Sequence, residues 1–178
     1  MKFTTLALWA ILSFYFSLYY HLPSVNAQAI LQPNSWNMEW NSYTKDIRKD
    51  NLLLVLELSK QRLSLFKKET NEKMALVKSY PVITGKDSTP TPRGIFSLNS
   101  NDYDPKGIIM TGGYGQVTVY YWLGVVGNDI GIHDAPWRRN SEFLSVQGRS
   151  RGCINMIQND IKELSSRVYV GTKILITN

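Results

Sequence analysis

Cysteine and histidine, the side chains that most often bind transition metals, are nearly absent from this sequence. Cys153 is the only cysteine, and His21 and His133 are the only histidines among 178 residues. One cysteine excludes an internal disulfide framework, and so few ligands argue against a metal site. The remaining question is whether Cys153 is an inert core thiol or a nucleophile.

Charge is lacking over one long stretch near the N-terminus. Residues 3–20 carry no charge and are mostly apolar, Lys2 precedes them, and residues 25–27 (Val-Asn-Ala) resemble a cleavage site. We predict that residues 1–27 form a secretory signal peptide. The alternative is an uncleaved membrane anchor, because the uncharged stretch approaches the ~20 residues that span a bilayer.

Blocks of like charge are lacking as well. The chain has 20 Lys and Arg residues against 14 Asp and Glu residues, a net charge of +6, and the basic residues are scattered along it. Cleavage after Ala27 would leave 19 basic residues and a net charge of +5. Scattered basic residues argue against a nucleic-acid partner. A mild positive charge suits an anionic surface, and it equally suits ordinary solubility.

The rest of the chain is rich in short strand patterns. Apolar runs or period-two alternation predict strands at residues 51–58, 62–68, 75–84, 95–98, 116–126 and 130–133, with two more pieces around Gly171. Pro81 indicates an edge strand or an irregularity. The polar residues 28–50 are predicted to be a linker or an irregular N-terminal segment. Residues 51–178 are predicted to form one mainly β domain.

One helix is predicted directly after Cys153. Asn155 and Gln158 have the spacing of a capping box, and apolar residues then recur at helical spacing as far as Val168. A helix N-terminus or a histidine close to a thiol lowers the pKa of the thiol. The sequence therefore predicts an environment that favours the thiolate of Cys153.

His133 is the candidate base for such a thiol, because it ends an apolar strand where side chains reach a sheet edge. Ser150, Asp134 or a backbone carbonyl is a candidate to orient its ring. Residue types alone leave a second interpretation open, since buried structural cysteines are common and the pairing of one cysteine with one histidine is not specific.

Several spaced motifs resemble the catalytic domain of the L,D-transpeptidases of bacterial cell walls, the YkuD type. Sixteen residues separate His133 from the stretch SRGCIN at 150–155, a spacing similar to that of the family signature. The stretches TGKDSTPTPRGIF (84–96) and YYWLGVVGNDIGIHDAPWR (120–138) are also similar, the second to Gram-positive members. The resemblance implies a YkuD-like mixed β-sandwich in which one helix follows the catalytic cysteine.

The resemblance also implies roles for individual residues. Cys153 matches the nucleophile and His133 the general base. Gly152 would provide an oxyanion amide together with Cys153, and Ser150 matches a residue that assists the histidine in some members. These four residues are the expected catalytic group.

Four further residues are expected to contact the substrate: Arg151, Asn155, Asp134 and Trp122. Arg151 stands where the family usually has a second histidine. Because arginine does not act as a base at neutral pH, the base role falls on His133. Arg151 would instead raise the local positive potential, or it is a solvated residue on the rim.

The activity that the resemblance implies is acyl transfer between peptidoglycan stem peptides. Cys153 would form a thioester with a stem tetrapeptide, release D-Ala, and transfer the acyl group to an amine to give a 3→3 cross-link. No organic cofactor is implied. The product would serve cell-wall biogenesis and cell shape. The alternatives are an L,D-carboxypeptidase or amidase on wall peptides, and a non-enzymatic wall-binding homologue.

The predicted signal peptide implies a location outside the cytoplasm. The protein would be secreted to the cell wall or the extracellular face, or to the periplasm of a Gram-negative source. Contact with a membrane would occur only through an uncleaved N-terminal segment.

Overall fold

The computed structural model describes residues 51–70, 73–112, 115–145 and 147–178, so the predicted signal peptide and linker lie outside the described residues. Nine strands are present in these ranges: β1 (Leu52–Glu57), β2 (Arg62–Lys68), β3 (Met74–Ile83), β4 (Gly94–Ser97), β5 (Asp102–Gly112), β6 (Gly115–Val126), β7 (Ile130–Asp134), β8 (Ile154–Met156) and β9 (Lys173–Thr177).

Helix is scarce in the same ranges. They contain one α-helix, α4 (Gln158–Ser165), and two short 3₁₀ helices, η1 (Leu58–Lys60) and η2 (Asn140–Leu144). The prediction of a mainly β fold with one helix after the cysteine is confirmed. None of the helices in the described ranges is long and apolar enough to cross a bilayer.

The strands form one mixed sheet in the order β4-β9-β1-β2-β3-β8-β7-β6-β5. Two neighbouring pairs, β1 with β9 and β7 with β8, are parallel, and the other pairs are antiparallel. Strand β3 joins the two halves, because its first part pairs with β2 while Val82 and Ile83 pair with β8. Pro81 lies where this change of partner occurs, so it marks an irregularity and not an edge strand.

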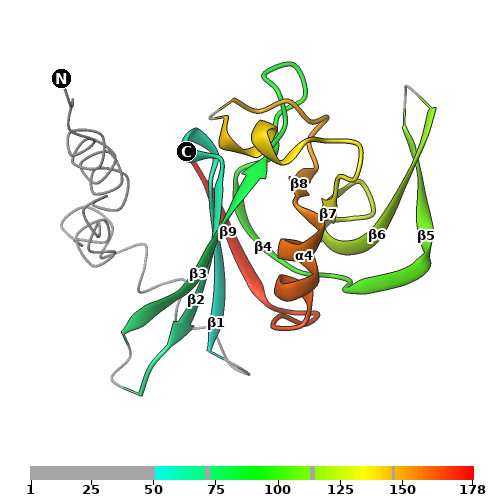
Figure 1. Cartoon of the computed structure of the whole chain (residues 1–178). Coiled ribbons are helices and arrows are strands. Elements are labelled where there is room, and N and C mark those ends of the chain that lie inside the picture. Colours follow the sequence, from blue (N-terminus) through cyan, green and yellow to red (C-terminus); the bar gives the residue numbers. More distant parts are fainter. Residues whose placement is uncertain (1–50, 71–72, 113–114, 146) are drawn as a thin grey trace, which may run out of the picture. The chain divides into compact units, whose positions relative to one another are not determined.

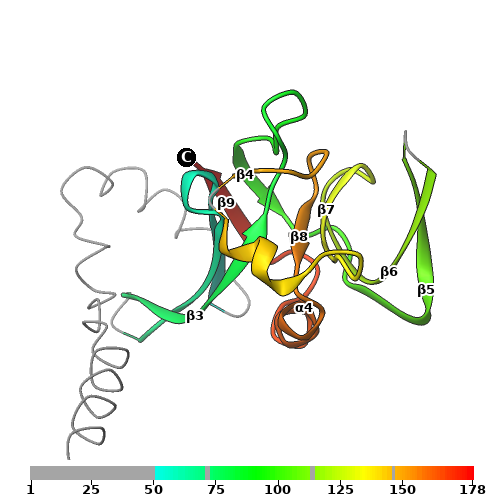
Figure 2. The ribbon, with the colours of Figure 1, turned by 45° about the horizontal axis from the view of Figure 1, so that its top comes forward.

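The two halves of the sheet lie on either side of a shared apolar core (Figures 1 and 2). Side chains of β1, β2, β3 and β9 meet those of β6, β7 and β8 in one buried cluster. Ile161 and Leu164, the buried face of α4, belong to the same cluster. The hairpin of β5 and β6 extends away from this core (Figure 1).

Two details of the predicted strand pattern are wrong. The piece before Gly171 is a turn, and only Lys173–Thr177 beyond it is a strand. Strand β5 was not predicted, because Pro105 and Gly107 interrupt its pattern. The register between β5 and β6 shifts between Tyr103 and Ile108, which accommodates both residues as an irregularity.

Candidate active site

A row of three side chains crosses the middle of one half of the sheet. Trp122 of β6 is paired with His133 of β7, and His133 is paired with Asn155 of β8. Ile132 and Ile154, which flank this row, point into the apolar core. Because side chains alternate along a strand, His133 and Asn155 face the opposite side together. The sheet register therefore creates the site.

Cys153 lies in the bend that directly precedes β8, two residues before Asn155, and its thiol contacts the Asp129 oxygen just before β7. The alternation of β8, continued back by one residue, would place its side chain on the side of His133. The backbone reaches it through Gly152, whose φ of +118° is one that L-residues rarely adopt. A Cβ atom at position 152 would also lie 2.7 Å from Cδ1 of Ile130. The positive φ therefore favours glycine before the cysteine, and the Ile130 side chain would also have to shift for any larger residue.

The imidazole of His133 is held at both nitrogens and is only 2% exposed. Nδ1 lies 2.7 Å from the backbone oxygen of Asp134, an acceptor, so Nδ1 carries the proton. Nε2 lies 3.0 Å from Nδ2 of Asn155, which donates to it. The structure therefore holds a neutral histidine whose lone pair is on Nε2, the form that acts as a base.

The thiol of Cys153 does not hydrogen-bond to His133 in the described residues. It donates to the backbone oxygen of Asp129 at 3.5 Å. Burial raises the pKa of the Cys153 thiol, and the Asp129 carboxylate adds to this, whereas the backbone amide of Gly131 opposes it. Burial lowers the pKa of His133, and the positive charge of Arg138 lowers it further. The hydrogen bond to the backbone of Asp134 and the charge of Asp134 act in the opposite direction and raise it. The resting pair is a neutral thiol beside a neutral imidazole.

The predicted effect of a helix N-terminus on the thiol is wrong. Asn155 does not cap the helix: it lies in β8, and its side chain bonds to His133. Helix α4 begins at Gln158, and its N-cap, Ile157, makes no side-chain capping bond. The helix therefore starts farther from Cys153 than the sequence indicated, and the pKa of the thiol is raised and not lowered.

Ser150 and Gly152 stabilise the turn of residues 149–153, which carries the candidate nucleophile and which we call the nucleophile turn. The hydroxyl of Ser150 donates to the backbone oxygen of Cys153 and accepts from the Gly152 amide at 3.1 Å. The resemblance had implied that Ser150 assists His133. Its hydroxyl instead bonds within the turn and not to the histidine. The Gly152 amide is already hydrogen-bonded, which leaves Cys153 as the better candidate of the two for an oxyanion donor.

The structure separates the four residues expected to contact the substrate. Trp122 is half-buried and stacks on His133, with ring centroids 5.9 Å apart. Arg151 is exposed beside the cysteine. Asn155 is 2% exposed and bonds to the histidine. Asp134 is 0% exposed, so its side chain is closed to a substrate.

The Asp134 side chain instead links β7, the strand of His133, to β6 by hydrogen bonds. Its Oδ1 accepts from the backbone amides of Tyr120 and Tyr121 at 2.7 and 2.9 Å. Its backbone oxygen orients the imidazole of His133. The interpretation that a backbone carbonyl orients the ring is therefore the one that the structure supports.

Residues 84–91, which we call the support loop, hydrogen-bond to the nucleophile turn and stabilise it. The Thr84 oxygen accepts from the amides of Arg149 and Ser150, both at 2.8 Å. The hydroxyl of Thr91 donates to the Gly152 oxygen at 2.7 Å and accepts from the Gly85 amide at 2.8 Å. The sequence predicted a loop here, but it carried no signal for this contact.

Trp137 and Arg138, which follow His133 in the chain, also belong to the site, and they were not identified from the sequence. Trp137 lies on the imidazole with ring centroids 6.0 Å apart and is 48% exposed. Arg138 donates to Oδ1 of Asn155 at 3.0 Å. Both lie within the motif around His133, which was the available signal for them.

A groove lies on the far side of the support loop. Lys86, Arg93, Gln147 and Gly148 are among its lining residues, and neither Cys153 nor His133 is. This groove is therefore distinct from the site of the thiol and the imidazole.

A mixed β-sheet that carries a cysteine close to a neutral histidine has the groups that a cysteine-nucleophile enzyme requires. Comparison with known families makes this more specific. Residues 51–176 match the model of the L,D-transpeptidase catalytic domain named YkuD, so the chain belongs to this family.

Individual relatives agree with this assignment. Proteins named putative L,D-transpeptidase YkuD from Bacillus licheniformis and Bacillus subtilis are 37% and 33% identical over 60% and 57% of this chain. The matches cover 56% and 54% of those proteins, so the chain spans about half the length of these relatives. These identities support a branch resembling Gram-positive members.

Solved structures share the fold. The catalytic domain of an Enterococcus faecium L,D-transpeptidase is 27% identical, with a TM-score of 0.53 over 73% of this chain and 99% of that one. An L,D-transpeptidase solved in complex with imipenem is 25% identical, with a TM-score of 0.60 over 72% of this chain and 59% of that one. The implied mixed β-sandwich is confirmed.

Proposed function

We propose that this protein is a peptidoglycan L,D-transpeptidase that works through a thioester on Cys153. The observation that carries the proposal is the fixed neutral tautomer of His133, with its lone pair on Nε2, in the strand beside the one that Cys153 directly precedes. Membership of the L,D-transpeptidase catalytic domain family supports the choice of wall stem peptides as substrates.

The first half of the reaction forms the acyl-enzyme. Rotation of the Cys153 side chain moves Sγ away from the Asp129 oxygen and toward Nε2 of His133, where it replaces the Asn155 amide hydrogen. As the proton passes to Nε2, sulfur bonds to the carbonyl carbon between the third stem residue and the terminal D-Ala. The carbon–nitrogen bond then breaks, and the imidazolium returns the proton to the departing amine.

The second half transfers the acyl group. An amine of a neighbouring stem attacks the thioester carbonyl and gives its proton to His133, while the thiolate leaves and recovers a proton. With the amine of a third-position residue as acceptor, the product is a 3→3 cross-link. Since the resting groups are neutral, His133 has to act during the attack and not before it.

Two aromatic rings beside the imidazole support a restricted approach to it. Trp122 stacks on His133 with ring centroids 5.9 Å apart, and the ring of Trp137 lies tilted against it at 6.0 Å. Rings in these positions exclude water from the ring faces of the base, which favours an amine acceptor over hydrolysis. We also propose that residues 1–27 direct export, which would bring the site to the wall.

The decisive experiment incubates the full chain with a defined tetrapeptide muropeptide and identifies the products by mass spectrometry. Transpeptidation gives cross-linked dimers and free D-Ala, whereas trimmed monomers alone would establish the carboxypeptidase. Cys153→Ala should abolish both products, and His133→Ala should reduce them by at least about 100-fold, the typical contribution of a general base.

A carbapenem gives a second, independent probe of the nucleophile. A covalent adduct on wild-type protein that is missing from Cys153→Ala would place the acylation on this residue. A wild-type protein that forms neither an adduct nor a product would favour the non-enzymatic homologue.

A further inference from the structure

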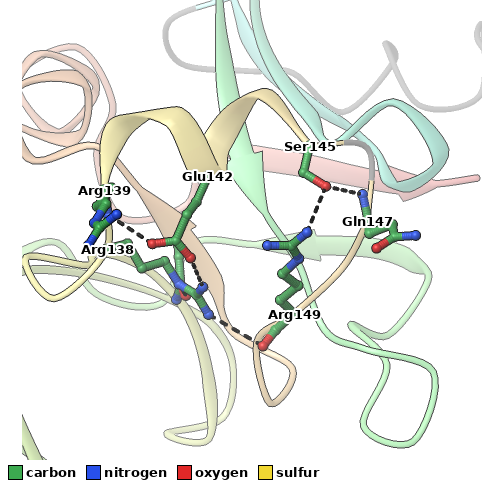
Figure 3. A network of polar contacts seen from close by, with 7 residues as sticks. Arg138, Arg139, Glu142, Ser145, Gln147 and Arg149 are labelled. Atoms are coloured by element: carbon green, nitrogen blue, oxygen red, sulfur yellow. Dashed lines mark hydrogen bonds and ion pairs between the residues drawn. The ribbon is translucent and has the colours of Figure 1, made fainter.

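Arg138 makes three contacts, one with β8 and two with the segment between β7 and β8. Its Nε donates to Oδ1 of Asn155 at 3.0 Å. One terminal nitrogen bonds to Glu142 at 3.1 Å, and the other donates to the backbone oxygen of Arg149 at 3.3 Å (Figure 3). The side chain of Arg138 is only 14% exposed. The guanidinium is thus fixed in place on three sides.

The contact with Arg138 determines the orientation of the Asn155 side-chain amide, that is, which of its two atoms, oxygen or nitrogen, faces His133. A guanidinium only donates, so it has to meet the amide oxygen. The amide nitrogen then points at Nε2 of His133 and donates to it. At the other end of this series of hydrogen bonds, the backbone oxygen of Asp134 accepts from Nδ1 of His133. One end can only donate and the other can only accept, so every hydrogen bond between them has a fixed direction.

We propose that Arg138 is a positioning residue that, through Asn155, holds His133 as the neutral tautomer with its lone pair on Nε2. Protonation of Nε2 would place an N–H against the Asn155 amide N–H. Relief by an amide flip would turn the amide nitrogen toward the guanidinium, which has no lone pair to offer. Arg138 therefore opposes the imidazolium through hydrogen bonding as well as through its charge.

The charges around His133 support this assignment. Asp134 of β7 is the nearby carboxylate, and its Oδ1 is already bonded to two backbone amides of β6. Tyr121 of β6 and Cys153 beside β8 are neutral, since burial raises the pKa of both. Beyond Arg138, Glu142 of η2 is paired with it. Arg138 is thus the cation that faces the imidazole through Asn155.

The test measures the tautomer directly, without any substrate. The full chain is labelled with ¹⁵N-histidine, and the two histidines are distinguished with His21→Ala. Wild-type His133 should show one protonated and one unprotonated nitrogen, with Nδ1 protonated. In Arg138→Gln, whose amide can present either its oxygen or its nitrogen, the pKa of His133 should rise by about 1 unit or more.

Three matched variants test whether the effect on His133 comes from the hydrogen-bond donor at position 138. They control for the loss of a nearby charge, for the loss of the ion pair with Glu142, and for the change of side chain. Arg139→Gln removes the same charge from an exposed neighbouring residue and should leave the His133 titration unchanged. Glu142→Gln weakens the ion pair of Arg138 but keeps its contact with Asn155, so it should also have little effect. Arg138→Lys, another pure donor, should restore the wild-type tautomer.

The catalytic consequence rests on the proposed function and is measured separately. At a pH below the pKa of His133 in both proteins, Arg138→Gln should acylate Cys153 about tenfold more slowly than wild type, with a smaller difference at higher pH. An Arg138→Gln titration equal to that of Arg139→Gln overturns the proposal. A shifted titration without any acyl transfer by wild type would refute only the proposed function.

Discussion

At position 131, the missing side chain leaves room for the indole of Trp122 beside the catalytic row. A Cβ atom on Gly131 would lie 2.6 and 2.7 Å from two atoms of that ring, and 2.8 Å from the Leu123 oxygen. These distances are too short for any Cβ, so the ring or the strand would have to move. The stacking of Trp122 on His133 thus depends on a glycine one strand away.

We therefore expect Gly131→Ala to destabilise the protein by ~1–3 kcal/mol, the usual cost of overpacking. Displacement of Trp122 should also slow the acylation of Cys153 by a carbapenem. Urea unfolding and adduct formation followed by mass spectrometry measure the two effects.

Gly127→Asn is the matched control for this substitution. No atom lies within 4 Å of a Cβ at position 127, and asparagine tolerates its φ of +52°. An unchanged adduct rate in Gly131→Ala would show that the indole is not needed where it lies.

At the residue scale, the roles predicted for Cys153 and His133 stay predictions, whereas the prediction of Asn155 as a helix cap is wrong. Cys153 and His133 were identified by their spacing and by the motifs around them. The N-x-x-Q pattern at Asn155 is a local signal for a helix cap, whereas its place in β8 depends on pairing with β7 and β3. Non-local pairing overrode the local preference, and the same pairing created the contact with His133.

At the scale of elements, the support loop and the nucleophile turn behave as one unit. They lie 61 residues apart in sequence, yet the loop contacts the turn through both backbone and side chains. Gln61 holds the start of the loop, with bonds of 2.7 and 2.6 Å to the amide and hydroxyl of Thr84. The glycines and prolines of 84–96 predicted the loop, but the partner of Thr91 was not readable from local pattern.

We expect Thr91→Val to cost about 1–3 kcal/mol of unfolding free energy. Valine has nearly the same shape but leaves the Gly152 oxygen and the Gly85 amide without their partner, and position 91 is only 3% exposed. Acylation of Cys153 should slow as well, because the turn before the cysteine loses its support. Thermal unfolding and the carbapenem adduct rate measure the two effects, and Thr91→Ser, which keeps the hydroxyl, should resemble wild type. A loss in Thr91→Ser without a loss in Thr91→Val would point to the methyl group instead of the hydroxyl.

At the scale of the whole molecule, the last strand is an interior one. Strand β9 lies between β4 and β1, and three of its five residues are buried. The strand itself was predicted from its apolar run, but its two neighbours were not, because both are distant in sequence. Parallel pairing with β1 joins residues from opposite ends of the domain.

Removal of residues 173–178 should therefore prevent folding of the whole domain. The truncation would expose the facing edges of β4 and β1 and open the core at Ile174 and Ile176. Circular dichroism and the yield of soluble protein provide the measurement. Deletion of Asn178 alone is the control, because that residue supplies only an exposed bond to Arg93. A truncated chain that still folds and forms the carbapenem adduct would show that β9 is dispensable.

The place of β9 also sets an order in time. The residues of the row formed by Trp122, His133 and Asn155 pair with one another over a short span of the chain, whereas β1 pairs with β9 across most of the domain. Closing so long a loop is slow, and unpaired strand edges invite association with other chains meanwhile. During synthesis the half of the sheet that holds β1 and β4 thus stays incomplete until its final strand emerges, and this interval is when the chain is most exposed to aggregation.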